Sequence, residues 1–238
     1  MKTLLAFRIA VLLATIAVGS CSAQAQVKQP RQVGTFQVVS SSGGIDVVLT
    51  QGAATSVVVV AADEAQKHVV TQVQGGTLTI GWEPNYSWKN LLSINRKVNV
   101  YITCPRLTGL SLSGGSDAKG ESPFSADDFR IEASGGSDVK LSLTAKTLTS
   151  VASGGSDVAL SGRVGRQTVR VSGGSDYNGF GLQSTTADVS ASGGSDVSVS
   201  VDGEISSSAS GGSDVRYKGT ARVARASHSG GGGVHHVQ

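Results

Sequence analysis

A five-residue motif, Ser-Gly-Gly-Ser-Asp, recurs six times in the second half of the chain and constrains its fold more than any other feature. The copies begin 21, 19, 19, 20 and 18 residues apart, at Ser113, Ser134, Ser153, Ser172, Ser192 and Ser210. A near-constant period of this size is typical of solenoids, in which each repeat forms one rung and buries its apolar side by stacking on its neighbours. The sequence therefore predicts an all-β solenoid.

The residues around the motif alternate between apolar and polar. The residue before the first Ser is always apolar, and the residue after Asp is usually Val. If one strand runs through the motif with period 2, the second Ser faces inward with the first Gly, and Asp faces outward. A kink at the Gly pair is the alternative geometry, and both place the six Asp in one column. We expect a ladder of hydrogen bonds from rung to rung along the inward serines Ser116, Ser137, Ser156, Ser175, Ser195 and Ser213.

Residues 34–108 have a looser period, and we expect irregular β coils there that continue into the solenoid at 109–233. Strands are predicted over 35–39, 45–49, 56–61, 69–73, 77–81 and 97–103, with a short helix over 63–68. The segment 82–96 breaks the pattern and predicts a loop or cap. Weaker motif copies begin at Ser42 and Ser229, and the second is interpreted as a degenerate last rung. Residues 26–33 are interpreted as a linker and 234–238 as a tail.

The N-terminus, residues 1–25, has the pattern of a signal peptide, with Lys2 and Arg8 before an apolar run over 9–18. Two processing routes compete. Ala23-Gln24-Ala25 suits ordinary cleavage before Gln26, whereas 18–21 resembles a lipobox that would leave a lipidated Cys21. Both routes predict export to the periplasm, outer membrane or cell surface, with a lipid anchor at Cys21 as the one membrane attachment expected.

Charge and motif content exclude several classes of function. Without residues 1–25 the chain keeps 18 basic and 17 acidic residues, a net charge of +1, so we expect no nucleic-acid partner. Cys104 then has no second cysteine with which to form a disulfide. The sequence contains no Gly-x-Ser-x-Gly elbow, phosphate loop, dinucleotide fingerprint or paired-Cys metal site. We therefore expect neither an enzyme nor a bound cofactor.

Four further segments occur in a characteristic order. They are Gly-Gly-Ile-Asp-Val-Val-Leu over 43–49, Gly-Thr-Leu-Thr-Ile over 76–80, Val-Tyr-Ile-Thr-Cys-Pro over 100–105 and Leu-Ser-Leu-Ser-Gly-Gly-Ser-Asp over 110–117. In this order the sequence resembles the GIN domain family, the auto-transporter adhesin head domains, over roughly residues 34–220. The resemblance implies an exported, right-handed, single-stranded β-helix of about 18–21 residues per repeat, and it brings no catalytic residues.

The column of outward carboxylates is the sharpest candidate site. Neighbouring carboxylates about 4.8 Å apart repel by roughly 0.9 kcal/mol in water, so either bound cations or hydrogen bonds from turn amides should offset the charge. The column consists of Asp117, Asp138, Asp157, Asp176, Asp196 and Asp214. A calcium site of the nine-residue Gly-Gly-x-Gly-x-Asp type does not fit the period, and equivalent carboxylates do not provide the unequal pair of a glycosidase. Because the repeats vary by three residues in length, we expect no pocket in the array.

Two other groups of side chains are weaker candidates. Trp82, Tyr86 and Trp88 could stack on sugar rings or could cap the solenoid core. His228, His235 and His236 could hold a metal but lie in what we expect to be a fraying tail. We expect a non-enzymatic envelope or surface protein that binds a glycan or another protein. A scaffold that self-associates through its ends is the alternative, and a polysaccharide-acting enzyme is less favoured.

Overall fold

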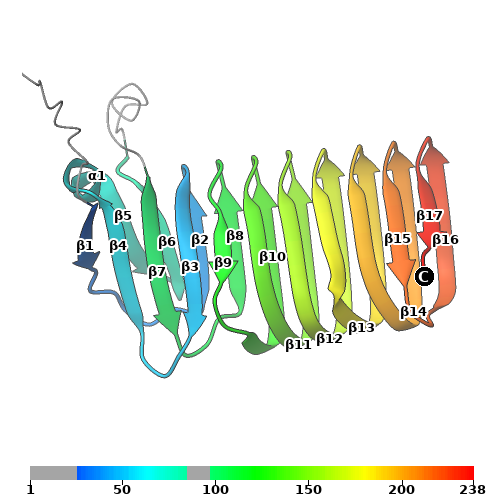
Figure 1. The fold of residues 1–238 in the computed structure, drawn as a ribbon, viewed down its shortest axis with the longest axis horizontal. Coiled ribbons are helices and arrows are strands. Elements are labelled where there is room, and N and C mark those ends of the chain that lie inside the picture. Colours follow the sequence, from blue (N-terminus) through cyan, green and yellow to red (C-terminus); the bar gives the residue numbers. More distant parts are fainter. Residues whose placement is uncertain (1–25, 85–96) are drawn as a thin grey trace, which may run out of the picture.

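The computed structural model describes residues 26–84 and 97–238, which form the predicted all-β solenoid of about 7 turns (Figure 1). The repeat array runs from the short strands β8 (Gly109–Ser113) and β9 (Ala118–Gly120) into strands that each bend around a whole rung. These strands are β10 (Phe124–Ser134), β11 (Asp138–Ser153), β12 (Asp157–Gly173), β13 (Asp176–Gly193) and β14 (Asp196–Gly211). The array ends with β15 (Asp214–Lys218), β16 (Arg222–Gly230) and β17 (Gly233–His236).

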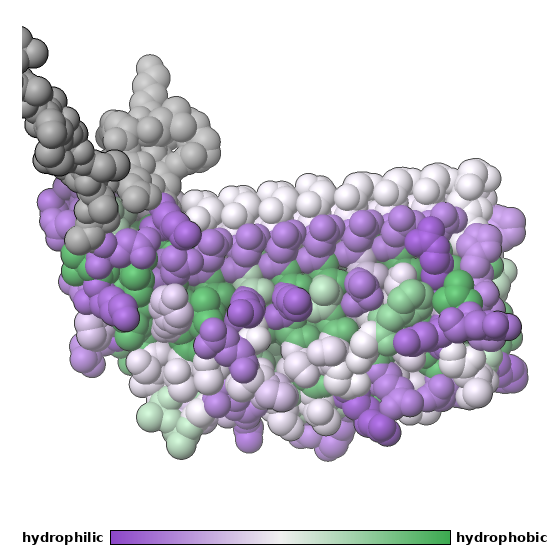
Figure 2. Space-filling model, viewed as in Figure 1, coloured by the Kyte–Doolittle hydropathy of each residue, from purple (hydrophilic) through white to green (hydrophobic). Residues whose placement is uncertain are grey.

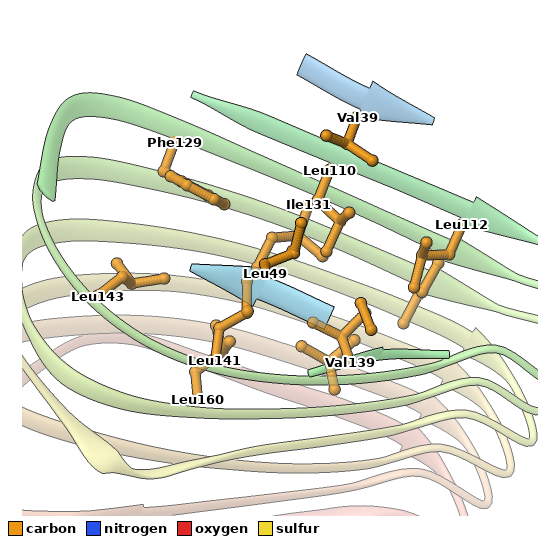
Figure 3. Close-up of a cluster of buried hydrophobic side chains, with 14 of the residues drawn as sticks. Val39, Leu49, Leu110, Leu112, Phe129, Ile131, Val139, Leu141, Leu143 and Leu160 are labelled. Atoms are coloured by element: carbon orange, nitrogen blue, oxygen red, sulfur yellow. The ribbon is translucent and has the colours of Figure 1, made fainter. Parts of the chain in front are cut away.

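Successive rungs are parallel and stack like on like. Val139 pairs with Val158, and Val158 pairs with Tyr177, because the motif fixes the register at each turn. The apolar side chains consequently form columns along the solenoid interior. Figure 3 shows Leu110 and Ile131 from successive strands packed against side chains from the opposite wall. The core is therefore one continuous stack, in which each rung covers the apolar face of the next.

The weak motif copy that begins at Ser42 does not lie at the end of the solenoid. Its strands β2 (Val38–Ser42) and β3 (Ile45–Gln51) pair with β8 and β9 of the first full copy, 71 residues later in the chain. On their other side they pair with β6 (Thr77–Trp82) and β7 (Val98–Cys104). The chain therefore leaves the stack after β3, builds the N-terminal end, and returns to continue the array.

The N-terminal end differs from the array because its outer strands are antiparallel. β4 (Ser56–Ala62) pairs with β7, β5 (Val69–Gln74) pairs with β6, and β1 (Gln26–Pro30) pairs with β4. The helix α1 (Asp63–His68) joins β4 to β5 and buries Ala65 and Gln66. The helix prediction over 63–68 is confirmed. β1 falls within the segment 26–33 that we interpreted as a linker.

The motif itself is a kinked turn, so the interpretation of one strand running through it is wrong. Strands end at or just after the first Ser and resume at or just after Asp. The first Gly has φ between +65° and +84° in all six copies, and both glycines are exposed, whereas the second Ser is buried. A Cβ at Gly154 would lie 3.3 Å from the Gly135 nitrogen of the previous rung. The first Gly is therefore required both for its backbone conformation and for close stacking of the turns.

The buried serines form a ladder, but its partners are backbone groups. Ser156 Oγ donates to the Ser153 carbonyl of its own turn (3.0 Å) and accepts from the Ser137 amide of the previous rung (3.3 Å). Ser195 Oγ likewise donates to the Ser192 carbonyl, and the Ser195 amide donates to Ser213 Oγ. The Ser156 hydroxyl thus makes one hydrogen bond within its own turn and one with the preceding turn. Both bonds satisfy polar groups that would otherwise be buried without partners.

Other predictions concern the ends of the chain and the lone thiol. The segment expected to fray belongs to β16 and β17, which are paired strands. Burial raises the pKa of Cys104 to about 11, so this thiol is unreactive at neutral pH. In the described parts of the chain, no helix is long and apolar enough to cross a membrane. The predicted signal peptide, including Cys21, lies outside the described residues.

Candidate functional site

The outward carboxylates form one continuous column along a flat face of the solenoid, and the column has seven members. Strand register and hydrogen bonds place the six predicted Asp residues in this column. They add Asp46, from the weak motif copy that begins at Ser42, as a seventh member. In spatial order the Asp column comprises Asp46, Asp117, Asp138, Asp157, Asp176, Asp196 and Asp214. Figure 2 shows a continuous hydrophilic row directly below the pale row of turns along this face.

Backbone amides of neighbouring rungs support the column. The Asp138 amide donates to Asp117 Oδ1 (3.0 Å), and the Asp117 amide donates to Asp46 Oδ1 (3.2 Å). The Asp196 amide makes the same contact with Asp176 Oδ1 (3.2 Å). These bonds come from motif amides and join one rung to the next. Amide donors therefore offset part of the charge repulsion that the stacking creates.

The two ends of the column differ in charge. At the C-terminal end, an Arg216 nitrogen lies 3.4 Å from Asp214 and 3.7 Å from Asp196, and His235 Nε2 lies 3.7 Å from Asp214. Closer to the N-terminal end, burial and then repulsion from Asp117 and Asp157 raise the pKa of Asp138. Burial also raises the pKa of Asp46, against the opposing effects of the Asp117 amide and of Lys97.

A shallow groove of about 450 Å³ runs along this part of the face. The Asp column forms one wall, and Val48, Lys119 and Lys140 form the other, because these three occupy one outward column of β3, β9 and β11. The inward residues Val47, Ala118 and Val139 line its base. The wall with Val48 continues to Tyr101, whose ring is 46% exposed. We call this the Asp-face groove.

A second hollow of about 330 Å³ continues the Asp-face groove, because both include Lys140 and Ala159. It extends the path over Ser142, Ser161 and Asn178. The expectation that the array has no pocket is therefore wrong. Uniform repeat length excludes a deep cleft between long loops, but small residues such as Ala159 and Gly181 beside Lys140 still leave hollows between the outward columns.

Sequence reasoning missed Asp46 and the lysine wall. Asp46 belongs to the weak motif copy, so its residue type could be read, but its place beside Asp117 depends on a strand pairing across 71 residues. Lys119 and Lys140 each follow a motif Asp by two residues. This shared offset was the signal that could have placed them in one outward column.

The aromatic candidates are only partly described. Trp82 Nε1 donates to the Gly43 carbonyl (2.9 Å), and the half-buried ring packs against the core. A Cβ at Gly43 would lie 2.8 Å from Trp82 Cδ1, so the ring covers the first motif turn closely. This geometry favours the capping role for Trp82. Tyr86 and Trp88 lie outside the described residues, and sugar stacking by this group stays a prediction.

The three histidines are separated. His236 stacks on Tyr217 with ring centroids 4.9 Å apart, His235 faces Asp214, and His228 is exposed in the column of Ala209. Among the residues in 26–84 and 97–238, no three His, Cys, Asp or Glu side chains are grouped so that they could hold a metal ion. A cation ladder along the Asp column stays a prediction.

Solved structures of low sequence identity share this fold. An adhesin described as putative from Bacteroides fragilis matches with a TM-score of 0.82 at 20% identity, covering 90% of this chain and 98% of its own. A protein from Parabacteroides distasonis described as a putative lipid binding protein matches at 0.70 and 18%, covering 91% and 98%. One from Parabacteroides merdae, described as a putative adhesin, matches at 0.70 and 15%, with the same coverage. At these identities the likeness establishes the fold alone.

The family comparison covers most of the chain. No curated protein matches the sequence, whereas the family model described as "Putative auto-transporter adhesin, head GIN domain" matches residues 35–221. This range includes β2 to β15 and six of the seven rungs of the Asp column in full. The name of the family supports an adhesion-like role at the cell surface. The chain therefore belongs to the GIN domain family of auto-transporter adhesin heads.

Proposed function

We propose that this protein is a non-enzymatic surface protein that binds an extended glycan along the Asp-face groove. The observation that carries the proposal is a groove between a wall of carboxylates and a wall in which Val48 stands beside two lysines. Binding sites for small and extended ligands typically combine an apolar floor with a few polar groups that fix orientation. The groove follows the solenoid axis, so a ligand lying in it would meet one Asp per rung.

The chemistry of the two walls suits a polyhydroxyl ligand. Carboxylates such as Asp117 and Asp138 accept hydrogen bonds from hydroxyl groups, while Lys119 and Lys140 donate to ring and hydroxyl oxygens. Outward-facing Val48 and the aliphatic stems of Lys119 and Lys140 offer apolar surface to the CH faces of sugar rings. The exposed ring of Tyr101 extends this surface beyond Val48. A peptide strand could use the same groups, so a protein ligand is the second outcome that the experiment must separate.

The Asp column also explains why we propose binding without catalysis. Acid and nucleophile roles require two carboxylates in strongly different surroundings. Asp117, Asp138 and Asp157 have the same neighbours on each side and lie on an open face. Incubation with polysaccharides and measurement of reducing ends checks this part of the proposal, because new reducing ends would contradict it.

A glycan array followed by calorimetric titration tests the binding proposal. We expect the double variant Lys119→Ala/Lys140→Ala to lose at least tenfold in affinity for any glycan bound by the wild type. Lys67→Ala is the matched control, because Lys67 is an exposed lysine on α1 that pairs with Glu64 far from the groove. Equal loss in both variants would indicate a general charge effect. Silence on glycan and matrix-protein arrays would overturn adhesion, and binding to proteins alone would overturn the glycan ligand.

Export and anchoring form a separate part of the proposal. We propose cleavage of the N-terminal segment, either before Gln26 or before Cys21 at a lipobox, and display in the cell envelope. Mass spectrometry of the N-terminus of protein purified from envelopes distinguishes a chain that begins at Gln26 from one that begins at an acylated Cys21. An intact Met1 terminus would contradict both routes.

A further inference from the structure

The last rung presents a strand edge that is paired on one side only. β16 pairs with β14, and β17 pairs with β15, and no other strand within residues 26–84 and 97–238 lies against their outer edges. In Figure 1 these two strands form the far end of the stack. An edge of this kind carries a row of backbone N–H and C=O groups that can pair with another strand.

The interior columns also end exposed at this rung. Val223 continues the column of Ile205 and is 42% exposed, although Ile205 is 0% exposed. Ala226 continues the column of buried Ser207 and is exposed, and Val234 follows buried Val215 and is half-buried. In every preceding rung of the array such positions are covered by the next rung. The end face of the solenoid therefore combines apolar Val223, Ala226 and Val234 with His228, which continues the column of buried Ala209, and it has an unpaired backbone edge.

The opposite end has a different construction. There, α1 with its buried Ala65 and Gln66 lies beside β1 and β4, and the strands β4 and β5 run antiparallel to the array. That end does not repeat the geometry of the rungs, so it does not match the parallel edge of β16. A head-to-tail filament would need the two ends to be complementary, whereas a two-fold dimer needs only that one surface fits itself.

We propose that two copies of this protein join through their last rungs, with β16 of one copy pairing antiparallel with β16 of the other. The pairing would satisfy both strand edges and cover Val223 and Ala226 of each copy with β16 of its partner. The interior would then be continuous through the junction. The proposal is independent of glycan binding at the Asp-face groove, which lies several rungs away.

The size and charge of the end face indicate a weak dimer. The nine residues of β16 extend about 30 Å, so one rung end provides less than the roughly 800 Å² per partner of a standard stable interface. Arg222 is held by Glu204, and His235 and His236 contact Asp214 and Tyr217. Arg225 and His228 have no such partner among the described residues and would lie against the partner's β16, which carries the same side chains. We therefore expect association that increases with protein concentration and with ionic strength.

Sedimentation velocity of the purified protein over a hundredfold range of concentration tests the proposal. We expect a monomer–dimer equilibrium in which Val223→Lys and Ala226→Lys shift the midpoint to at least tenfold higher concentration. Ser190→Lys is the matched control, because it adds the same charge at an exposed position of β13, away from the last rung. Thermal melts of each variant establish that the fold is retained.

Each outcome has a defined meaning. A dimer weakened by the two end-face variants and unchanged in Ser190→Lys supports the proposal. A dimer that all three variants leave unchanged would place the interface elsewhere, and a monomer at every concentration would overturn the proposal outright. Slowed amide exchange in 222–230 on dimerisation is a second readout, since pairing of β16 protects its outer amides. Unchanged exchange there despite dimerisation would contradict pairing through β16.

Discussion

The Tyr177 hydroxyl donates a hydrogen bond of 2.9 Å to Gln167 Oε1 in the interior of the solenoid, where both side chains are fully buried. Gln167 Nε2 in turn donates to Ser184 Oγ (2.8 Å), and Ser184 Oγ donates to the Ser200 carbonyl. Three side chains on two neighbouring rungs thus form a chain of hydrogen bonds in the interior, separate from the serine ladder. Burial raises the pKa of Tyr177, so the phenol remains a donor at neutral and mildly alkaline pH.

The hydrogen bond between Tyr177 and Gln167 couples the effects of replacing these two residues. Tyr177→Phe leaves Gln167 Oε1 buried without a donor, and we expect a loss of about 1–3 kcal/mol in the free energy of unfolding. Gln167→Leu alone leaves the Tyr177 hydroxyl unpaired and costs a similar amount. The double variant should lose less than the sum, because leucine at 167 continues the apolar column of Phe129 and Leu148. Urea unfolding of all four proteins measures the coupling, and strictly additive losses would contradict it.

The two glycines of one turn should differ sharply on replacement by alanine. Gly173 has φ +82°, and a Cβ there would lie 3.1 Å from the Gly154 nitrogen, whereas Gly174 has no positive φ and open space around it. We expect Gly173→Ala to cost about 1–3 kcal/mol. Gly174→Ala should be neutral or should stabilise by up to about 1 kcal/mol through the unfolded state. Denaturant midpoints of the pair decide this, and equal losses would show that the turn conformation is misassigned.

The serine ladder gives a second matched pair. Ser156→Ala removes one donor and one acceptor, so the Ser137 amide loses its partner in the interior and the Ser153 carbonyl keeps only the Gly135 amide. We expect a loss of about 1–3 kcal/mol. Ser192→Ala, at an exposed motif position whose carbonyl is unaffected, should change stability by less than about 0.5 kcal/mol. If thermal unfolding showed a larger loss of stability for Ser192→Ala than for Ser156→Ala, the role assigned to the ladder would be refuted.

Most of the fold could be predicted because the repeat imposes it locally. The period of the motif determined the solenoid, and the burial of Ser156 and exposure of Asp157 followed from side-chain alternation. The sequence does not distinguish a kink at the glycines from a straight strand, because a Gly pair is compatible with both. Pairings across long stretches of chain could not be derived. Asp46 and Asp117 are 71 residues apart in the sequence and become neighbours because β3 pairs with β9. No local pattern indicates which strand β3 pairs with.

The candidate site was predictable only in part for the same physical reason. The Asp column depends on one position per repeat, which the motif displays. The Asp-face groove depends on which residues stand two positions later in neighbouring rungs, where the repeat is not conserved between copies. Lys119, Lys140 and Ala159 occupy equivalent positions but differ in size and charge. The hollow between them therefore arises from side chains that the repeat leaves free to vary.

Repulsion within the Asp column predicts a pH-dependent effect of Asp138→Asn. The pKa of Asp138 is raised, first by burial and then by Asp117 and Asp157, so the folded state binds its proton more tightly than the unfolded chain does. The stability associated with this group is therefore fully present below the unfolded pKa of about 3.9 and is lost as pH rises through the folded pKa. At pH 7 the charged carboxylate destabilises the fold. Asparagine removes that charge and keeps an oxygen acceptor for the neighbouring amide.

We expect Asp138→Asn to increase the free energy of unfolding at pH 7 by up to about 1 kcal/mol after solvent screening, and to change it little at pH 3. Urea midpoints of variant and wild type at both pH values measure the difference. Asp196→Asn is the matched control, because Asp196 lies 3.7 Å from Arg216 and loses an attraction when its charge is removed. It should therefore gain nothing at pH 7. A gain for Asp138→Asn that persists at pH 3 would mean that something other than charge repulsion limits the stability of the column.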